Sequence, residues 1–165
     1  MESLQITIPV EVFTADDTSM SEADRTLVEE AKKVSRTSYA PHSKFHVGAA
    51  VRLADGTIVC GSNQENAVFP AGCCAERTAL YSAGALHPDV AVVAIAIAAW
   101  READGKFLSE PCSPCGICRQ HLVETEQRHN QQIRVVLYGT RRTFVLHSAA
   151  DLLPLTFTGK ELNPS

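Results

Sequence analysis

Two short stretches of the chain hold five of its six cysteines. The first stretch is Cys73–Arg77, with the sequence CCAER, and the second is Pro111–Gln120, with the sequence PCSPCGICRQ. Cys115 and Cys118 have the Cys-x-x-Cys spacing that is typical of zinc sites. If the two stretches meet in space, Cys74 supplies a third thiolate. We therefore expect these three cysteines to bind one Zn²⁺, with water as the fourth ligand.

The neighbours of these cysteines suit a reactive zinc site. Helices are predicted to begin near Cys74 and near Pro114, and the free backbone N–H groups and dipole at a helix start stabilise thiolates. Zinc with three protein ligands lowers the pKa of its bound water toward about 7. Glu76 is then placed to carry a proton from that water to a substrate, although it could also be a solvated first-turn glutamate. We expect Arg77 to donate a hydrogen bond to the sulfurs.

Two other metal sites are compatible with the same cysteines. Cys112 lies three residues before Cys115, so four cysteines could form a closed, purely structural zinc site. The spacing of Cys112, Cys115 and Cys118 also resembles part of an iron–sulfur cluster motif, but Leu122 stands where the fourth cysteine is expected. These alternatives differ from the open zinc site in the number of thiolates or in the metal.

The composition indicates one soluble domain. The chain has 165 residues, of which 45% are hydrophobic and 21% charged, with a formal net charge of −4. The acidic balance argues against a nucleic-acid partner. The longest apolar run, Val90–Trp100, is too short to cross a membrane. Met1–Pro9 is too short and polar for a secretory signal, so we expect reduced cysteines and a cytoplasmic location.

The hydrophobic pattern predicts an α/β fold, namely a three-layer α/β/α sandwich around a mixed five-stranded sheet. Helices are expected at 21–38, 74–83 and 114–127, with a short last helix from 148. Strands are expected at 45–53, 57–60, 90–100, 133–138 and 143–147. Residues 5–13 alternate as an edge strand would. We divide the chain into an N-terminal extension of unknown role, 1–20, and a catalytic domain, 21–165.

The two cysteine stretches match the signature of zinc deaminases. That signature is a metal ligand, any residue and a glutamate, followed by Pro-Cys-x-x-Cys. This chain has Cys-Ala-Glu at 74–76 and Pro-Cys-Gly-Ile-Cys at 114–118. The match joins the predicted ligands and Glu76 in one motif.

A wider set of segments resembles the cytidine deaminase family, in its small, homotetrameric form. The segments are YAPHSKFHVGAA at 39–50, NQENA at 63–67, CAERTA at 74–79, SPCGICRQ at 113–120 and DLLPLTF at 151–157. The resemblance runs from about residue 25 to residue 162. It implies a deaminase-like fold with one Zn²⁺ per subunit.

The resemblance also implies an activity. Such an enzyme converts cytidine, and 2′-deoxycytidine, to uridine or deoxyuridine and ammonia, in pyrimidine salvage. A zinc-activated hydroxide attacks C4 of the base, and Glu76 acts as the proton shuttle. An alternative substrate is a related cytosine-nucleoside compound.

Roles for further residues follow from the same resemblance. Phe45, Asn63 and Glu65 match residues that hold the nucleoside, the last two near the ribose 3′-hydroxyl. The Ala75 N–H and the Ser113 carbonyl match groups that read the pyrimidine edge. Phe157 matches a ring that reaches the pocket of a neighbouring subunit and packs on the base. The resemblance therefore implies that the active site is complete only in the homotetramer. The chain departs from the family at His42 and Phe69, where tyrosine is common, and at the extra cysteines Cys73 and Cys112.

Overall fold

The computed structural model describes residues 1–162. The predicted catalytic domain ends at residue 165, so its last three residues lie outside the described part. Within residues 1–162, no helix combines the length and the apolar character needed to span a membrane.

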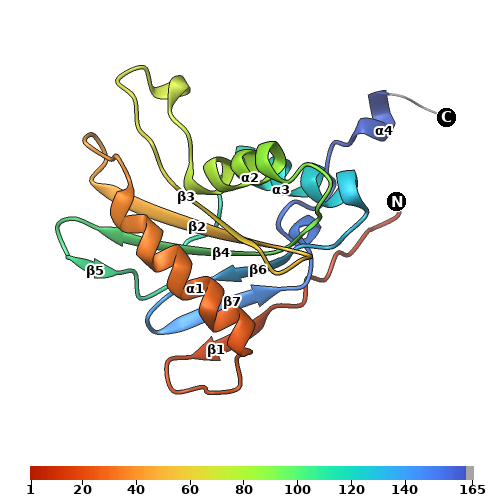
Figure 1. Ribbon diagram of the computed structural model, residues 1–165. Helices are drawn as coiled ribbons and strands as arrows, with labels where there is room; N and C mark the ends of the chain where they lie inside the picture. Colours follow the sequence, from red (N-terminus) through yellow and green to blue (C-terminus); the bar gives the residue numbers. More distant parts are fainter. Residues whose placement is uncertain (163–165) are drawn as a thin grey trace.

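One mixed, seven-stranded sheet forms the centre of the molecule (Figure 1). Six strands lie in the order β1-β7-β6-β4-β2-β3, and β5 pairs with β4. The β4–β6 pair is parallel and the other pairs are antiparallel. The strands are β1 (Glu11–Thr14), β2 (Phe45–Leu53), β3 (Ile58–Ser62), β4 (Val92–Arg101), β5 (Lys106–Phe107), β6 (Arg134–Leu137) and β7 (Arg142–Leu146).

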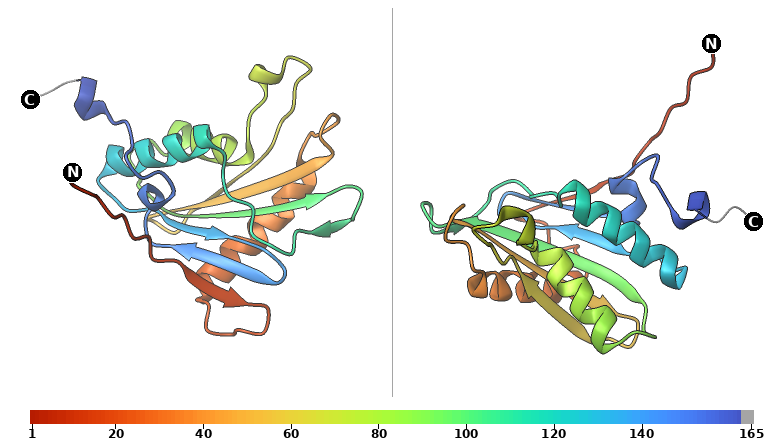
Figure 2. Two further views of the ribbon diagram at one scale, coloured as in Figure 1. Left: turned by 180° about the vertical axis from the view of Figure 1, so that it is seen from behind. Right: turned by 90° about the horizontal axis from the view of Figure 1, so that it is seen from above.

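Helices cover both faces of the sheet, which confirms the predicted α/β/α layers. Helix α1 (Glu22–Val34) lies across one face, and α2 (Ala75–Leu86) and α3 (Gly116–His129) lie across the other (Figure 2). Two separate cores result, one under α1 and the other under α2 and α3. Short 3₁₀ segments and a terminal turn complete the fold: η1 (Ser35–Thr37), η2 (Phe69–Ala71), η3 (Ala149–Leu152) and α4 (Gly159–Leu162).

Alternation along β4 explains the two cores. Ile95 and Ile97 point to the α2–α3 side, whereas Ala94, Ala96 and Ala98 point to α1. Successive residues of a strand face opposite sides of the sheet, so one apolar run serves both layers. The small alanines leave room for α1 close to the sheet. The strand that we predicted from continuous hydrophobicity is therefore buried on both faces.

The predicted count of five strands was too low. Strand β5 has only two residues, too few for a pattern to be seen. Strand β1 lies later than the predicted alternation at 5–13, and it pairs with β7, with Glu11 opposite Val145. Both strands are short and pair with a single neighbour. Each packs one phenylalanine, Phe13 or Phe107, against the core under α1, which is too little for an apolar pattern to be seen in the sequence.

The helix ends differ in detail from the prediction. Ser21 caps α1, because its hydroxyl accepts a hydrogen bond from the Asp24 N–H at 3.1 Å. Helix α2 continues beyond the predicted range 74–83, and its C-cap is His87, which precedes a proline. Helix α3 begins one residue after its N-cap, Cys115, and not at the preceding proline.

A buried carboxylate fastens the C-terminal segment to α3. Glu126 is 8% exposed. It accepts hydrogen bonds from the Ile133 N–H at 2.7 Å, the Ser148 hydroxyl at 3.0 Å, the Ala149 N–H at 2.8 Å and the Ala150 N–H at 3.2 Å. The last three donors lie at the start of η3, where N–H groups lack helical partners. Glu126 thus fixes where η3 begins.

Replacing Glu126 with alanine should destabilise the fold. The change leaves several buried donors unsatisfied, which costs about 3 kcal/mol or more of unfolding free energy. Urea unfolding measures this loss. Glu124→Ala, an exposed change on the same helix, is the control and should stay within about 0.5 kcal/mol of the parent protein. Equal stability of the two variants would contradict the role given to Glu126.

Candidate active site

The starts of α2 and α3 converge on one point beside the sheet. Cys74 is the N-cap residue of α2, and Cys115 is the N-cap residue of α3. Gly61 on β3 allows α2 to approach, because a Cβ atom at this position would lie 2.3 Å from the Ala79 nitrogen. The close contact of α2 with β3 sets the position of Cys74, and Cys118 lies in the first turn of α3.

The structure brings the three predicted metal ligands together. The sulfurs of Cys74, Cys115 and Cys118 all lie within 4.8 Å of one another. The Sγ–Sγ distance is 3.9 Å from Cys74 to Cys115 and 3.5 Å from Cys115 to Cys118. Three sulfurs at tetrahedral positions around zinc are expected roughly 3.8 Å apart. The cluster therefore fits zinc, and among the described residues it does not include Cys112.

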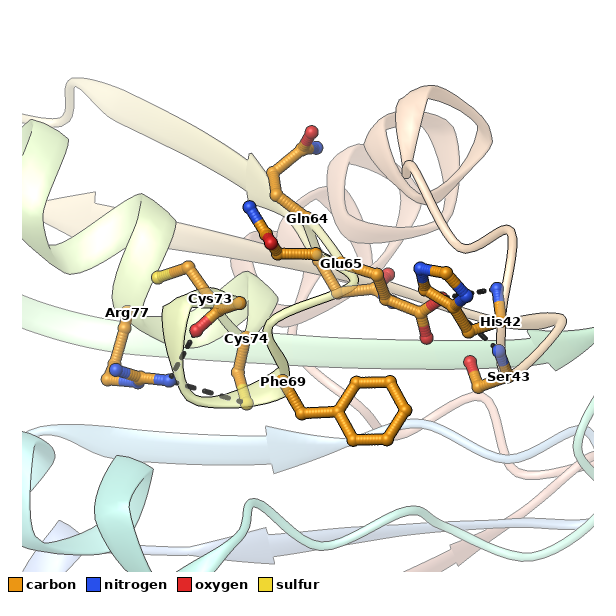
Figure 3. A pocket seen from close by; sticks show the side chains of 11 residues that line it. His42, Ser43, Gln64, Glu65, Phe69, Cys73, Cys74 and Arg77 are labelled. Carbon is orange, nitrogen blue, oxygen red and sulfur yellow. Dashed lines mark hydrogen bonds between the residues drawn. The ribbon is translucent and has the colours of Figure 1, made fainter.

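Neighbouring donors favour a thiolate at Cys74. A hydrogen bond with the Cys118 thiol lowers the pKa of Cys74 to about 5, and Arg77 acts in the same direction. The same hydrogen bond, together with burial and the charge of Glu76, raises the pKa of Cys118. The Arg77 Nη2 donates to the Gly72 carbonyl at 3.5 Å and lies 4.0 Å from the Cys74 sulfur (Figure 3). Arg77 thus occupies the position expected of a donor to the sulfurs. Arg119, the other arginine near the ligands, turns to backbone carbonyls instead.

Glu76 is buried beside the cysteines. Its side chain is 4% exposed, so it is not the solvated first-turn glutamate considered as an alternative. Burial raises the pKa of Glu76 to about 7, and the negative charge on Cys74 adds to the increase. A carboxyl group with this pKa can both accept and release a proton near neutral pH.

A pocket of about 260 Å³ opens next to Glu76 and the cysteines. Six residues were predicted to hold the substrate. Five of them line this pocket, namely Phe45, Asn63, Glu65, Ala75 and Ser113, and Phe157 does not. The lining also includes residues that the sequence did not indicate: Ser43, Val47, Ile97 and Cys112. Val47 and Ile97 could have been found from the sequence, because the alternation along their strands places both side chains on the α2–α3 face of the sheet.

Hydrogen bonds to the backbone fix the Asn63 and Glu65 side chains in the lining of this pocket. The Asn63 Oδ1 accepts from the Val47 N–H at 2.8 Å, and its Nδ2 donates to the Phe45 carbonyl at 2.9 Å. The Glu65 Oε2 accepts from the N–H groups of His42 and Ser43 at 2.8 and 3.2 Å. These bonds leave one Nδ2 hydrogen of Asn63 and the other carboxylate oxygen of Glu65 for a ligand.

Hydrogen bonding also keeps Glu65 ionised. Ser43, followed by the His42 backbone, lowers the pKa of the Glu65 carboxyl group. Glu65 is therefore a negatively charged acceptor for hydroxyl groups.

Phe157 does not lie with the other predicted residues. It is 58% exposed and is not among the residues that line the pocket of its own chain. Its carbonyl accepts a hydrogen bond from the Gln120 side chain at 2.9 Å. The segment that carries Phe157 extends away from the sheet toward α4 (Figure 1).

A larger hollow of about 500 Å³ borders the pocket and shares Asn63, Glu65 and Cys74 with it. His42 and Phe69 form an edge-to-face contact in it, with ring centroids 5.9 Å apart (Figure 3). Both residues depart from the family pattern noted above. Cys73 also lines this hollow. Among the described residues, the sulfur cluster includes neither Cys73 nor Cys112.

Comparisons with known proteins agree with this geometry. Residues 21–133 match the family described as "Cytidine and deoxycytidylate deaminase zinc-binding region". The chain is 37% identical over 140 residues to a cytidine deaminase of Halalkalibacterium halodurans, covering 83% of this chain and 96% of the relative. It is 36% identical over 137 residues to a cytidine deaminase of Sporosarcina psychrophila, covering 83% and 93%.

Solved structures give the same result. The crystal structure of cytidine deaminase from Burkholderia pseudomallei matches with a TM-score of 0.68 and 37% identity, covering 84% of this chain and all of that one. The cytidine deaminase from Mycobacterium tuberculosis matches with a TM-score of 0.63 and 27% identity, covering 81% and 96%. The family match at 21–133 includes helices α1, α2 and α3 and the three clustered cysteines.

Substitution of single cysteines should separate a three-thiolate site from a four-thiolate site. We expect Cys115→Ser to lose bound zinc, because two thiolates remain, and Cys112→Ser to keep it, because Cys112 lies outside the cluster. Metal analysis of the purified variants measures the zinc content. Zinc loss from Cys112→Ser, or bound iron in the parent protein, would contradict this assignment.

The buried Glu76 should make stability depend on pH in metal-free protein. Its pKa is about 7 when folded and 4.5 ordinarily, so its contribution is complete below pH 4.5 and is lost as the pH rises through 7. Relative to Glu76→Gln, the unfolding free energy of the parent protein should fall by up to about 3 kcal/mol across this range. Urea unfolding of both proteins at several pH values measures it. A constant difference between them would refute the buried, protonated state.

Proposed function

The chain belongs to the cytidine and deoxycytidylate deaminase family, and we propose that it hydrolyses the 4-amino group of cytidine and 2′-deoxycytidine. The products are uridine or deoxyuridine and ammonia, as in pyrimidine salvage. One observation supports the proposal: a single pocket is lined by the buried Glu76, by Cys74 and Cys115 of the three-sulfur cluster, and by Asn63 and Glu65. In the proposal, Asn63 and Glu65 bind the sugar hydroxyl.

We assign one zinc ion per chain to the three cysteines. Cys74, Cys115 and Cys118 would hold it, since their sulfur spacing fits a tetrahedral thiolate site. When bound, zinc supplies Lewis acidity that activates a water molecule near neutral pH. Arg77 offsets part of the negative charge of three thiolates through its approach to Cys74.

Glu76 is the proton carrier in this proposal. It lines the pocket with Cys74 and Cys115, where it can take a proton from the attacking water and deliver it to N3 of the base. It then takes the remaining proton from the oxygen that has bonded to C4 and passes it to the amino group. The C4–N bond breaks, ammonia leaves, and the C4–O bond becomes the carbonyl of the product. Burial serves this role because a carboxyl group with a pKa near the working pH exchanges protons efficiently in both directions.

Backbone groups orient the base. Ala75 is the first residue of α2, so its N–H has no acceptor within the helix and is free for a ligand. The Ser113 carbonyl lines the same pocket and offers an acceptor for the amino group. Phe45 supplies an apolar wall. Asn63 and Glu65 bind the sugar hydroxyl through the remaining Nδ2 hydrogen of Asn63 and the remaining carboxylate oxygen of Glu65.

The pocket favours a free nucleoside over a nucleotide. Among the described residues that line it there is no lysine or arginine, and Glu65 is held ionised. A phosphate dianion would meet negative charge without a cation to pair with. Deoxycytidylate should therefore be a poor substrate, whereas a related cytosine nucleoside with a free sugar remains compatible with these contacts.

We further propose a cytoplasmic homotetramer in which Phe157 enters the pocket of a neighbouring chain. The exposure of Phe157 in a single chain supports this role. Residues 21–165 would form the catalytic domain, and 1–20 an extension that adds β1 to the edge of the sheet.

An ultraviolet assay tests the proposed activity. Cytidine and deoxycytidine should lose absorbance on addition of zinc-loaded protein, and deoxycytidylate should react far more slowly. Glu76→Gln should keep its zinc and lose at least about a thousandfold in kcat, because its proton carrier is gone. Near-normal turnover by this variant would contradict the role of Glu76, and inert cytidine would contradict the proposed function.

A further inference from the structure

Arg119 joins the metal loop to the C-terminal segment. It directly follows Cys118 on α3, but its side chain turns away from the sulfurs. Its Nε donates to the Pro114 carbonyl at 2.8 Å, and its Nη1 donates to the Leu152 carbonyl at 3.0 Å. One guanidinium therefore bridges two segments that are far apart in the sequence. The planar fork of arginine suits two such acceptors, which a lysine ammonium cannot span as well.

The first of these carbonyls lies immediately before a metal ligand. Residues 111–115 have no regular secondary structure, and Cys112, Ser113 and Cys115 line the pocket. The Pro114 carbonyl belongs to the peptide unit that leads into Cys115, so its orientation sets where the Cys115 sulfur points. Cys115 caps α3 without a side-chain hydrogen bond of its own. The Arg119 N–H also donates to the Cys115 carbonyl at 2.9 Å, so the backbone and the side chain of Arg119 together restrain this short loop.

The second carbonyl provides a fixed reference. Leu152 ends η3, is 8% exposed and packs in the core with Leu122 and Ala149. The other end of η3 is held by Glu126 through its hydrogen bonds to Ser148–Ala150. The anchor of Arg119 is thus a well-packed element and not a mobile tail.

We propose that Arg119 is a positioning residue that holds the Ser113–Cys115 loop in its metal-binding geometry by tying it to Leu152. This inference rests on the assignment of Cys115 as a zinc ligand in the proposed function. Arg119 does not touch the metal or the substrate. It acts through the Pro114 peptide, and it makes the C-terminal segment part of the support of the metal site.

The rate of zinc release to a chelator tests this role without any nucleoside. Partners that orient metal ligands contribute 10- to 100-fold to metal affinity in other zinc proteins, so we expect Arg119→Ala to release zinc about 10- to 100-fold faster than the parent protein. Arg119→Lys should lie between the two, because an ammonium reaches one carbonyl. Arg128→Ala, an exposed change on the same helix, should release zinc at the parental rate.

A second comparison separates positioning from general loss of stability. Glu126→Gln loosens the same C-terminal segment without contacting the metal loop. Arg119→Ala should release zinc faster than Glu126→Gln at equal loss of unfolding free energy. Hydrogen exchange of zinc-loaded Arg119→Ala should rise in residues 115–119. Parental zinc release by Arg119→Ala, or equal release by the two variants at matched stability, would overturn the proposal.

The zinc-release measurement tests the role of Arg119 separately from the proposed deaminase activity. If the parent protein left cytidine unchanged, faster zinc release from Arg119→Ala would still support the positioning role. If the parent protein were active and Arg119→Ala kept its zinc, only the role of Arg119 would fail.

Discussion

Four acidic groups are crowded at the place where α2 and α3 begin, and the fold has to hold them together. Three cysteine sulfurs lie within 4.8 Å of one another, and the buried carboxyl group of Glu76 lines the pocket beside them. Their mutual repulsion would separate them if the groups were ionised without compensation. Two helix starts supply partial positive charge at this point, and Arg77 adds a full charge near Cys74. A bound dication would complete the balance.

The packing of α2 and α3 on the sheet brings those two helix starts together. Gly61 removes the side chain that would hold α2 away from β3, and β4 provides the face on which both helices pack. On α3, Glu126 and Arg119 connect the helix to the segment that follows β7. The same helix carries Cys115 and Cys118 at its start and holds the C-terminal segment along its length. In the proposed zinc site, the geometry of the metal would therefore be coupled to the C-terminal structure through α3.

The sequence predicted the local parts of the site and missed the long-range ones. Cys115 and Cys118 could be paired from their spacing, because a Cys-x-x-Cys motif places both sulfurs at one helix start. Their meeting with Cys74 was expected from the resemblance to a family, since no periodicity predicts which loops converge. The contacts of Arg119 and Glu126 were not predicted at all. Both bind backbone groups of distant segments, and backbone acceptors and donors leave no trace in a sequence pattern.

The layers of the fold followed from apolar alternation, whereas the short strands did not. A two-residue strand such as β5 is defined only by its partner, Trp100–Arg101. Phe157 illustrates another limit, because the structure of one chain leaves this ring exposed, and the role proposed for it needs a second chain. Patterns within a sequence thus report burial more reliably than pairing or assembly.

The central claim is that three thiolates bind zinc and leave its fourth position to a non-protein ligand. X-ray absorption spectroscopy of the zinc-loaded protein tests it directly. We expect about three sulfur neighbours near 2.3 Å and one oxygen or nitrogen neighbour near 2.0 Å. Four sulfur neighbours would show that Cys112 closes the site, and would contradict the account.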